Sequence, residues 1–260
     1  MISTKEIDEF TSEIWELDEE QIELTKWIET QINQCFPDLS DLEINDILED
    51  IVSKVKFRLK KRIKLYKGKG LRPIYDFHPF LDDLLIHSEE ISSSKLREMK
   101  SSIKTMNWVE FESLCMKVLE TNGIDKVGIT RKIKEGGIDF YGVVTMDKYT
   151  SGSILKDLGI RIFGQARHHS GLQKVGPNEL KVLKEDCQNF QKGLGMATEV
   201  LPKWFVASKS PVVPMFITNT GYTKGADIYA KQEGILTKNG EQIAQDLILQ
   251  PKYLESMKKF

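Results

Sequence analysis

The sequence predicts an α/β domain, a sheet covered by helices on both faces, behind a separate all-helical domain. Two observations support this fold class. Apolar residues recur at helical spacing from residue 6 to about residue 66, whereas beyond residue 105 short apolar strands alternate with amphipathic helices. Between them lies a stretch rich in Ser and Pro, typical of a linker that ends in a short helix. We therefore expect two domains, residues 1–100 and residues 101–260.

The composition indicates a water-soluble globular protein. The chain has 260 residues, of which 40% are hydrophobic and 29% charged. Its first residues are acidic, and no run approaches the roughly 18 apolar residues of a membrane span, so a cytoplasmic location without membrane contact is expected. The three cysteines show no CxxC spacing, which predicts neither a disulfide framework nor a zinc site.

Charge is distributed unevenly along the chain. Residues 1 to 50 contain sixteen Asp or Glu against Lys5 and Lys26, a charge of −14. Because the whole chain carries −2, residues 51 to 260 must carry +12. The near-neutral net charge therefore conceals a strongly basic segment, residues 51 to 260, which fits a partner with negative charge.

The densest basic stretch, from Lys54 to Arg72, has ten Lys or Arg in nineteen residues and no acid. Apolar residues run through it at spacings of three and four, which predicts an amphipathic helix with a cationic remainder. Ser40 or Asp41 should cap this helix, and the sequence KGKG should end it. Its cations could bind phosphates or form a solvated face balanced by the acidic segment. The candidate nucleic-acid contacts are Lys60, Lys61, Arg62 and Lys64.

The second domain shows a regular succession of elements. NWVEFESLCMKVLETNG predicts a helix whose apolar face includes Trp108 and Phe111. Strands are expected at KVGITRKI, GGIDFYGVVTM, GIRIFGQAR and PVVPMFITNTGY, with a short one at the start of ILTKNGEQIAQDLILQ. Helices are expected at GPNELKVLKEDCQNFQKG and TKGADIYAKQEG, and a last helix closes the domain.

Three side chains of these strands suggest chemistry. Asp139 lies one residue into the second predicted strand, and Gln165 and Arg167 share one face of the third. If the two strands are neighbours, a carboxylate, an amide oxygen and a cation converge at the end of the sheet. Metal-assisted phosphodiester hydrolysis needs hard oxygen ligands and a cation near the phosphate. Glu112, on the preceding helix, could reach the same ion directly or through water.

Six short blocks in order resemble the catalytic domain of the Mrr-like restriction endonucleases, a branch of the PD-(D/E)xK nuclease superfamily. The blocks are FESLCMKVLETNGI, EGGIDFYG, GQAR, VGPNELKVLK, FITNTGYTKGADIYAKQEGI and KNGEQIAQDLI. Together they cover about residues 107–248. The resemblance implies a restriction-endonuclease-like mixed sheet flanked by helices. It matches nothing in residues 1–100.

The resemblance also implies an activity and site residues. The activity would be cleavage of double-stranded DNA in restriction or phage defence, with Mg²⁺ or Mn²⁺ as cofactor. Asp139 would bind the metal, Gln165 would be the second ligand of a Q-x-K motif, and Glu112 would be the glutamate of the helix. The catalytic lysine of the family falls on Arg167. Double-strand cleavage by a single-site nuclease would favour a homodimer.

Arg167 leaves the activity open. Arginine can keep the electrostatic part of the lysine's role, but it is permanently charged and cannot transfer a proton. Lys174, Lys132 or Lys134 could substitute for the lysine, and His168 and His169 could contact phosphate or act as a base. His168 and Lys174 are therefore also candidate nucleic-acid contacts. Three functions therefore compete: an active metal-dependent endonuclease, a DNA-binding protein with impaired chemistry on the same fold, and an assembly module whose basic helix pairs with its own acidic segment.

Overall fold

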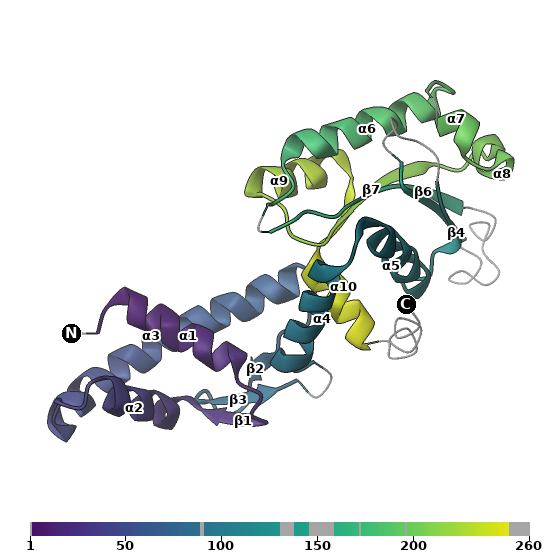
Figure 1. The fold of residues 1–260 in the computed structure, drawn as a ribbon. Helices are drawn as coiled ribbons and strands as arrows, with labels where there is room; N and C mark the ends of the chain where they lie inside the picture. The colour runs from purple at the N-terminus through teal and green to yellow at the C-terminus, as the bar shows by residue number, and fades with distance from the viewer. Residues whose placement is uncertain are drawn as a thin grey trace. The chain divides into compact units, whose positions relative to one another are not determined.

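A computed structural model describes residues 2–88, 91–130, 138–145, 159–171, 173–195 and 197–249. The chain divides into two compact units, Met1–Glu98 and Met99–Phe260, and the division falls within helix α4 (Ser93–Thr105). Figure 1 shows the elements of each unit. No helix in the described part of the chain is long and apolar enough to cross a membrane.

The N-terminal unit is built mainly from helices α1 (Thr4–Glu16), α2 (Leu24–Cys35) and α3 (Asp41–Gly68). Ser40 caps α3 in a capping box with Glu43, as the sequence predicts. The apolar stripe of α3 faces α1 and α2, and it buries Ile51, Val55, Leu59, Ile63 and Tyr66. Helix α3 ends at Gly68, within the KGKG sequence that was expected to end it.

The N-terminal unit also contains a small antiparallel sheet, so its prediction as all-helical is wrong in this part. The sheet has the strand order β1-β3-β2, formed by β1 (Gln21–Glu23), β2 (Tyr75–Phe77) and β3 (Leu84–His87). β2 and β3 form a hairpin inside the stretch expected to be a linker. Burial of Tyr75 and Leu85 ties this hairpin to the core of the unit.

The C-terminal unit is a mixed α/β fold, as predicted. Its five-stranded sheet has the order β4-β5-β6-β7-β8, in which β4, β5 and β6 are antiparallel neighbours and β6, β7 and β8 are parallel neighbours. Its elements are α5 (Trp108–Thr121), β4 (Asp125–Ile129), β5 (Phe140–Thr145), β6 (Gly159–Arg167), α6 (Pro177–Gln191), α7 (Ala197–Val200), α8 (Lys203–Ala207), β7 (Val212–Thr218), α9 (Lys224–Glu233), β8 (Leu236–Lys238) and α10 (Gly240–Leu249).

Helices cover both faces of the sheet (Figure 1). α6 and α9 pack together on one face, over β6, β7 and β8, and α5 lies on the other face beside α10. The core under α6 and α9 contains Phe163, Phe190, Phe205 and Phe216, all nearly inaccessible to solvent. Burial of this many large aromatic side chains is the main source of stability for the unit.

Trp108 differs from its predicted place on the apolar face of α5. Its side chain is 65% exposed, whereas Phe111 is buried. Trp108 is the first residue of α5, directly after the cap Asn107. The reason for its exposure is that the buried face of the helix begins one turn further along.

The strand register brings several chain segments to one end of the sheet. β6 and β7 run in parallel and finish there at Arg167 and Thr218, which lie side by side. β5 runs in the opposite direction and begins there, with Phe140 opposite Gly164. We call this the carboxyl end of the sheet. Polar side chains from β5, β6 and β7 can meet there, because each of these strands has one of its ends at this edge of the sheet.

Candidate active site

Asp139 lies at the carboxyl end of the sheet, directly before β5 rather than one residue into it. Its backbone nevertheless continues the ladder on both sides. The Asp139 amide donates to the carbonyl of Gly164 at 2.9 Å, and the Thr130 amide donates to the carbonyl of Asp139 at 3.0 Å. The predicted adjacency of the two motif-bearing strands is therefore confirmed.

The Asp139 carboxylate is held by a backbone group of the neighbouring strand. Its Oδ2 accepts a hydrogen bond of 2.8 Å from the amide of Ala166. Burial raises the pKa of Asp139, while the Ala166 amide and the charge of Arg167 act in the opposite direction. The carboxylate is thus anchored to Ala166, the residue between Gln165 and Arg167 in the chain.

Glu112 comes from the second turn of α5 and lies near Asp139. Burial raises the pKa of Glu112 to about 7, and the negative charge of Asp139 raises it further in the same direction. Both carboxylates also contribute, after burial itself, to raising the pKa of the Cys115 thiol. The site therefore gathers negative charge that the protein does not neutralise completely.

Gln165 and Arg167 occupy alternate positions of β6, and its regular pairing with β7 places them on one face. Gln165 is only 4% exposed. Arg167 ends the strand and is exposed. Gly164, before them, is needed for close approach, because a Cβ there would lie 1.8 Å from the ring of Phe140.

The two histidines after β6 point in different directions. The His168 ring contacts Phe111 at 5.3 Å between centroids, and its Nε2 lies 3.3 Å from the carbonyl of Ile103. This packing argues against the predicted phosphate contact of His168. The side chain of His169 is mostly buried, with Nε2 3.5 Å from a carboxylate oxygen of Glu179.

Asn219 anchors the segment that follows the site. Its Oδ1 accepts from the amide of His169 at 2.8 Å, and its Nδ2 donates to the carbonyl of the same residue at 3.0 Å. Asn219 is 4% exposed and directly follows β7. Sequence patterns did not predict this clamp.

The candidate substitutes for the catalytic lysine are not brought into the site by the described structure. Lys174 is exposed in the segment before α6, and among the described residues it forms no ion pair with Asp139 or Glu112. Lys132 and Lys134 lie outside the described residues, as do Gly136 and Gly137 of the GGID sequence. Arg167 is therefore the cation whose charge acts on Asp139 in the described part of the chain.

The predicted nucleic-acid contacts on α3 belong to the N-terminal unit and fall into two groups. Lys60 is paired with Asp82 at 2.7 Å, and Arg62 lies over the ring of Trp15 at 4.8 Å. These intramolecular contacts argue against phosphate binding by these two residues. Lys61 and Lys64 are exposed and have no partner among the described residues.

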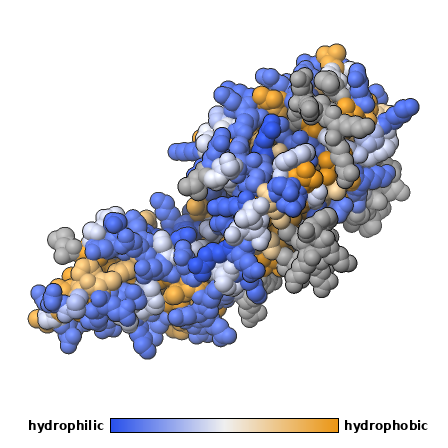
Figure 2. Space-filling view, in the orientation of Figure 1, coloured by the Kyte–Doolittle hydropathy of each residue, from blue (hydrophilic) through white to orange (hydrophobic). Residues whose placement is uncertain are grey.

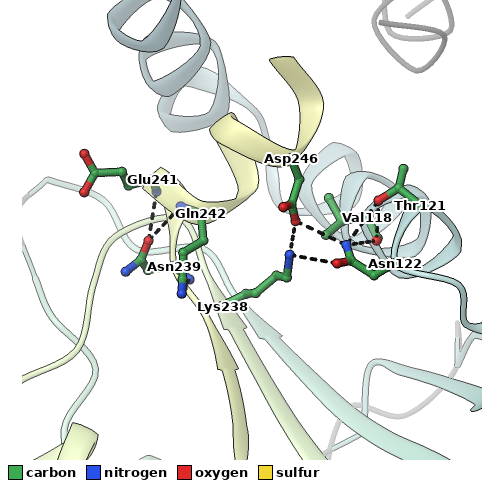
Figure 3. A network of polar contacts seen from close by, with 8 residues as sticks. All are labelled: Val118, Thr121, Asn122, Lys238, Asn239, Glu241, Gln242 and Asp246. Atoms are coloured by element: carbon green, nitrogen blue, oxygen red, sulfur yellow. Dashed lines mark hydrogen bonds and ion pairs between the residues drawn. The ribbon is translucent and has the colours of Figure 1, made fainter. Parts of the chain in front are cut away.

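A second charged cluster lies at the carboxyl end of the sheet, beside β8. The Lys238 ammonium contacts Asp246 of α10 and donates to Asn122 Oδ1 at 3.3 Å (Figure 3). Asn122 also donates to Asp246 at 3.2 Å and to the carbonyl of Val118 at 2.7 Å. Burial lowers the pKa of Lys238 to about 8.

The donor set around Asp139 fits a hard divalent cation. Asp139 and Glu112 offer carboxylate oxygens, and Gln165 offers the oxygen of a buried side-chain amide. No group of three or more His, Cys, Asp or Glu suited to a metal is found among the described residues. Mg²⁺ needs few protein ligands, because it keeps several waters and binds phosphate oxygens.

One protein-family model matches part of the C-terminal unit. Residues 103–200 match the Mrr catalytic family model, described as a restriction endonuclease. The resemblance deduced from the six sequence blocks is thereby confirmed over these residues, which are fewer than the predicted 107–248. Residues 103–200 therefore resemble the catalytic domain of a restriction endonuclease of the Mrr type.

Solved structures of restriction endonucleases are similar to this chain. The MspJI enzyme in complex with a 27-mer oligonucleotide is 16% identical, with a TM-score of 0.43 over 64% of this chain and 34% of that chain. The DNA modification-dependent enzyme AspBHI is 13% identical, with a TM-score of 0.43 over 75% of this chain and 47% of that one. FokI is 12% identical, with a TM-score of 0.39 over 98% and 46%. The matched parts span about a third to a half of these enzymes, and curated proteins give no match.

Proposed function

We propose that the chain is a divalent-metal-dependent DNA endonuclease that hydrolyses phosphodiester bonds. The observation that carries this proposal is the pair of carboxylates, Asp139 and Glu112, at the carboxyl end of the sheet. Burial, and then the negative charge of Asp139, raise the pKa of Glu112 to about 7, and the Arg167 cation lies at the end of β6 beside them. A protein that needed this region only for stability would be expected to pair or remove such charges.

Each residue has a role that its position supports. Asp139, fixed by the Ala166 amide, and Gln165, through its buried side-chain amide oxygen, would hold the metal ion. Glu112 would complete the site directly or through a bound water. When bound, the ion would supply positive charge to the scissile phosphate and lower the pKa of the attacking water.

Arg167 would bind a non-bridging oxygen of the scissile phosphate. Its guanidinium is permanently charged, so it can stabilise the charge that develops on phosphorus but cannot take a proton from water. Loss of one well-placed transition-state donor typically costs about 10²–10³ in rate. We therefore expect an active enzyme with a rate limited by this substitution of the family's lysine.

The direct test is plasmid nicking by the full chain. Modified and unmodified supercoiled plasmid would be incubated with the protein in Mg²⁺, in Mn²⁺ and in EDTA. The proposal expects open-circular or linear product in Mg²⁺ or Mn²⁺ and none in EDTA. Nicking that persists in EDTA would exclude metal dependence, and intact plasmid in every condition would exclude the nuclease.

A DNA-binding protein with impaired chemistry is the second candidate, and Arg167 is the observation that favours it. Such a protein would shift a labelled duplex in a gel and leave plasmid intact with either metal. The unaltered Asp139 and Gln165 favour the nuclease, because a site free of selection would be expected to lose its metal ligands as well.

The biological setting follows the same proposal. A role in restriction or phage defence in the cytoplasm would fit a DNA endonuclease, with the N-terminal unit serving target recognition or assembly. Cleavage of both strands would require two sites and hence a homodimer. Sedimentation of the chain with and without a DNA duplex would show which oligomer cleaves.

A further inference from the structure

The tip of the β2–β3 hairpin holds an aromatic side chain out into solvent. Phe80 is 89% exposed and Leu81 is 55% exposed. The tip nevertheless has a defined conformation, because His78 Nδ1 accepts from the amides of both Phe80 and Leu81 at 3.2 Å. The His78 and Phe80 rings also contact each other, at 6.0 Å between centroids.

The rest of the tip is anchored within the N-terminal unit. Asp82 pairs with Lys60 of α3 at 2.7 Å, and Asp83 pairs with Lys56 at 3.1 Å. Asp83 also accepts from the amide of Thr25 at 3.2 Å. Phe80 is therefore displayed by a fixed loop beside α3, and its exposure does not come from a loose chain.

The exposed face of α3 next to this tip combines cations with apolar side chains. Phe57 is 69% exposed and Leu65 is 54% exposed, and with Lys61 and Lys64 they follow the spacing of one helix face. Most other cations of the helix are engaged by acids, as in the pairs of Arg58 with Asp8 and Lys67 with Asp76. Lys61 and Lys64, which have no partner in the described chain, therefore lie beside the exposed apolar side chains of Phe57 and Leu65. Apolar patches among hydrophilic ones are visible on this unit in Figure 2.

We infer that the hairpin tip and this face of α3 form a surface for double-stranded DNA. Lys61 and Lys64 contact backbone phosphates, while Phe80, supported by Leu81, inserts as a wedge between base steps. Apolar wedges of this kind kink duplexes and are combined with cationic contacts to phosphates. The inference rests on the proposed function for its choice of partner, because the C-terminal unit carries the nuclease-like site.

Binding of a labelled duplex by the full chain in EDTA tests the wedge without requiring cleavage. Phe80→Ala should weaken binding about tenfold, the typical effect of losing one stacked aromatic contact. A 2-aminopurine placed along the duplex should brighten when the unaltered protein binds, because its base is unstacked, and should stay dark with the variant. Leu42→Ala is the matched control, since Leu42 is also exposed on α3, at 73%, and lies outside the proposed surface.

The salt dependence of binding tests the two lysines. Each phosphate contact contributes roughly 0.9 to the slope of log affinity against log salt, so Lys61→Gln combined with Lys64→Gln should reduce it by about 1.8. Lys26→Gln is the control, because Lys26 is an exposed lysine of α2, and this variant should leave the slope unchanged. Phe80→Ala should weaken affinity without altering the slope.

The outcomes separate this inference from the proposed function. If the unaltered chain binds and nicks DNA while the Phe80 and lysine variants behave like their controls, the surface is not for DNA and the nuclease stands. A protein partner would then be the occupant. If the chain neither binds nor cleaves DNA, both proposals are wrong. If it binds through this surface but cleaves nothing, the inference stands and the nuclease does not.

Discussion

Two charged clusters at the carboxyl end of the five-stranded sheet differ in whether their charges are neutralised within the protein. Beside β5 and β6, Asp139 and Glu112 repel each other, and burial and this repulsion raise the pKa of Glu112 to about 7. Beside β8, Lys238 contacts the carboxylate of Asp246, and Asn122 bonds to both (Figure 3). The first cluster is suited to bind an added cation, whereas the second already contains its own. Burial of charge alone therefore does not distinguish a working site from a structural one; the balance of charge does.

Removing Asp139 should give the largest effect. Asp139→Ala should abolish metal-dependent nicking, a loss of more than roughly 10³, because it deletes a fixed hard ligand without opening a core cavity. Plasmid nicking, with circular dichroism to verify folding, is the measurement. Asp139→Asn keeps the acceptor for the Ala166 amide and should be equally inactive. Unchanged nicking by a folded variant would remove Asp139 from the site.

Arg167→Lys should act in the opposite direction. A lysine there keeps the charge and restores a group that can exchange protons near the metal-bound water, so cleavage should rise by about 10²–10³. DNA affinity should change little, because one cation replaces another. Rates would be compared at saturating DNA. Equal or slower cleavage by the lysine variant would show that Arg167 is not a damaged lysine.

Breaking the second cluster should affect stability and not chemistry. Asp246→Ala leaves the Lys238 ammonium partly buried without its ion partner, which should cost about 2 kcal/mol of unfolding free energy at pH 7. The loss should shrink as pH rises through about 8, where Lys238 gives up its proton. Urea unfolding measures this, with exposed Glu185→Ala as control. A loss of cleavage by the folded variant would mean that the cluster belongs to the active site.

Glu112→Gln should give the smallest effect, on the pH dependence of stability without divalent metal. Because the folded pKa of Glu112 is raised from 4.5 to about 7, the folded protein binds more protons than the unfolded chain in that range, and its stability should fall as pH rises from 4.5 to 7. The variant lacks this fall and should be more stable at pH 8 by about 1 kcal/mol, after allowance for solvent screening. Glu120→Gln, exposed on the same helix, serves as control. Parallel pH profiles for the unaltered protein and the Glu112 variant would contradict the raised pKa of Glu112.

Local patterns predicted the regular parts of the fold, including the cap of α3 at Ser40 and strand β6. They missed the small sheet, because β1 has only three residues and because His78 and Pro79 gave the β2–β3 hairpin the sequence pattern of a linker. The strand pattern suggested Asp139, Gln165 and Arg167 as candidates, the resemblance gave each a role, and their convergence depends on strand pairing. The pairing of Lys60 with Asp82 and the clamp from Asn219 to His169 link residues 22 and 50 positions apart, which periodicity cannot reveal. Both contacts depend on how the chain folds back on itself.

The amide group of Asn219 imitates a peptide group. By accepting from the His169 amide and donating to the His169 carbonyl, it adds one more rung to the ladder between β6 and β7, after the main chain of β7 has turned away. The end of β6 that carries Arg167 is thereby continued by a segment held on the same side. Fraying of a strand normally begins at its last hydrogen bond. The Asn219 side chain therefore determines how far the pairing between the segments of β6 and β7 extends.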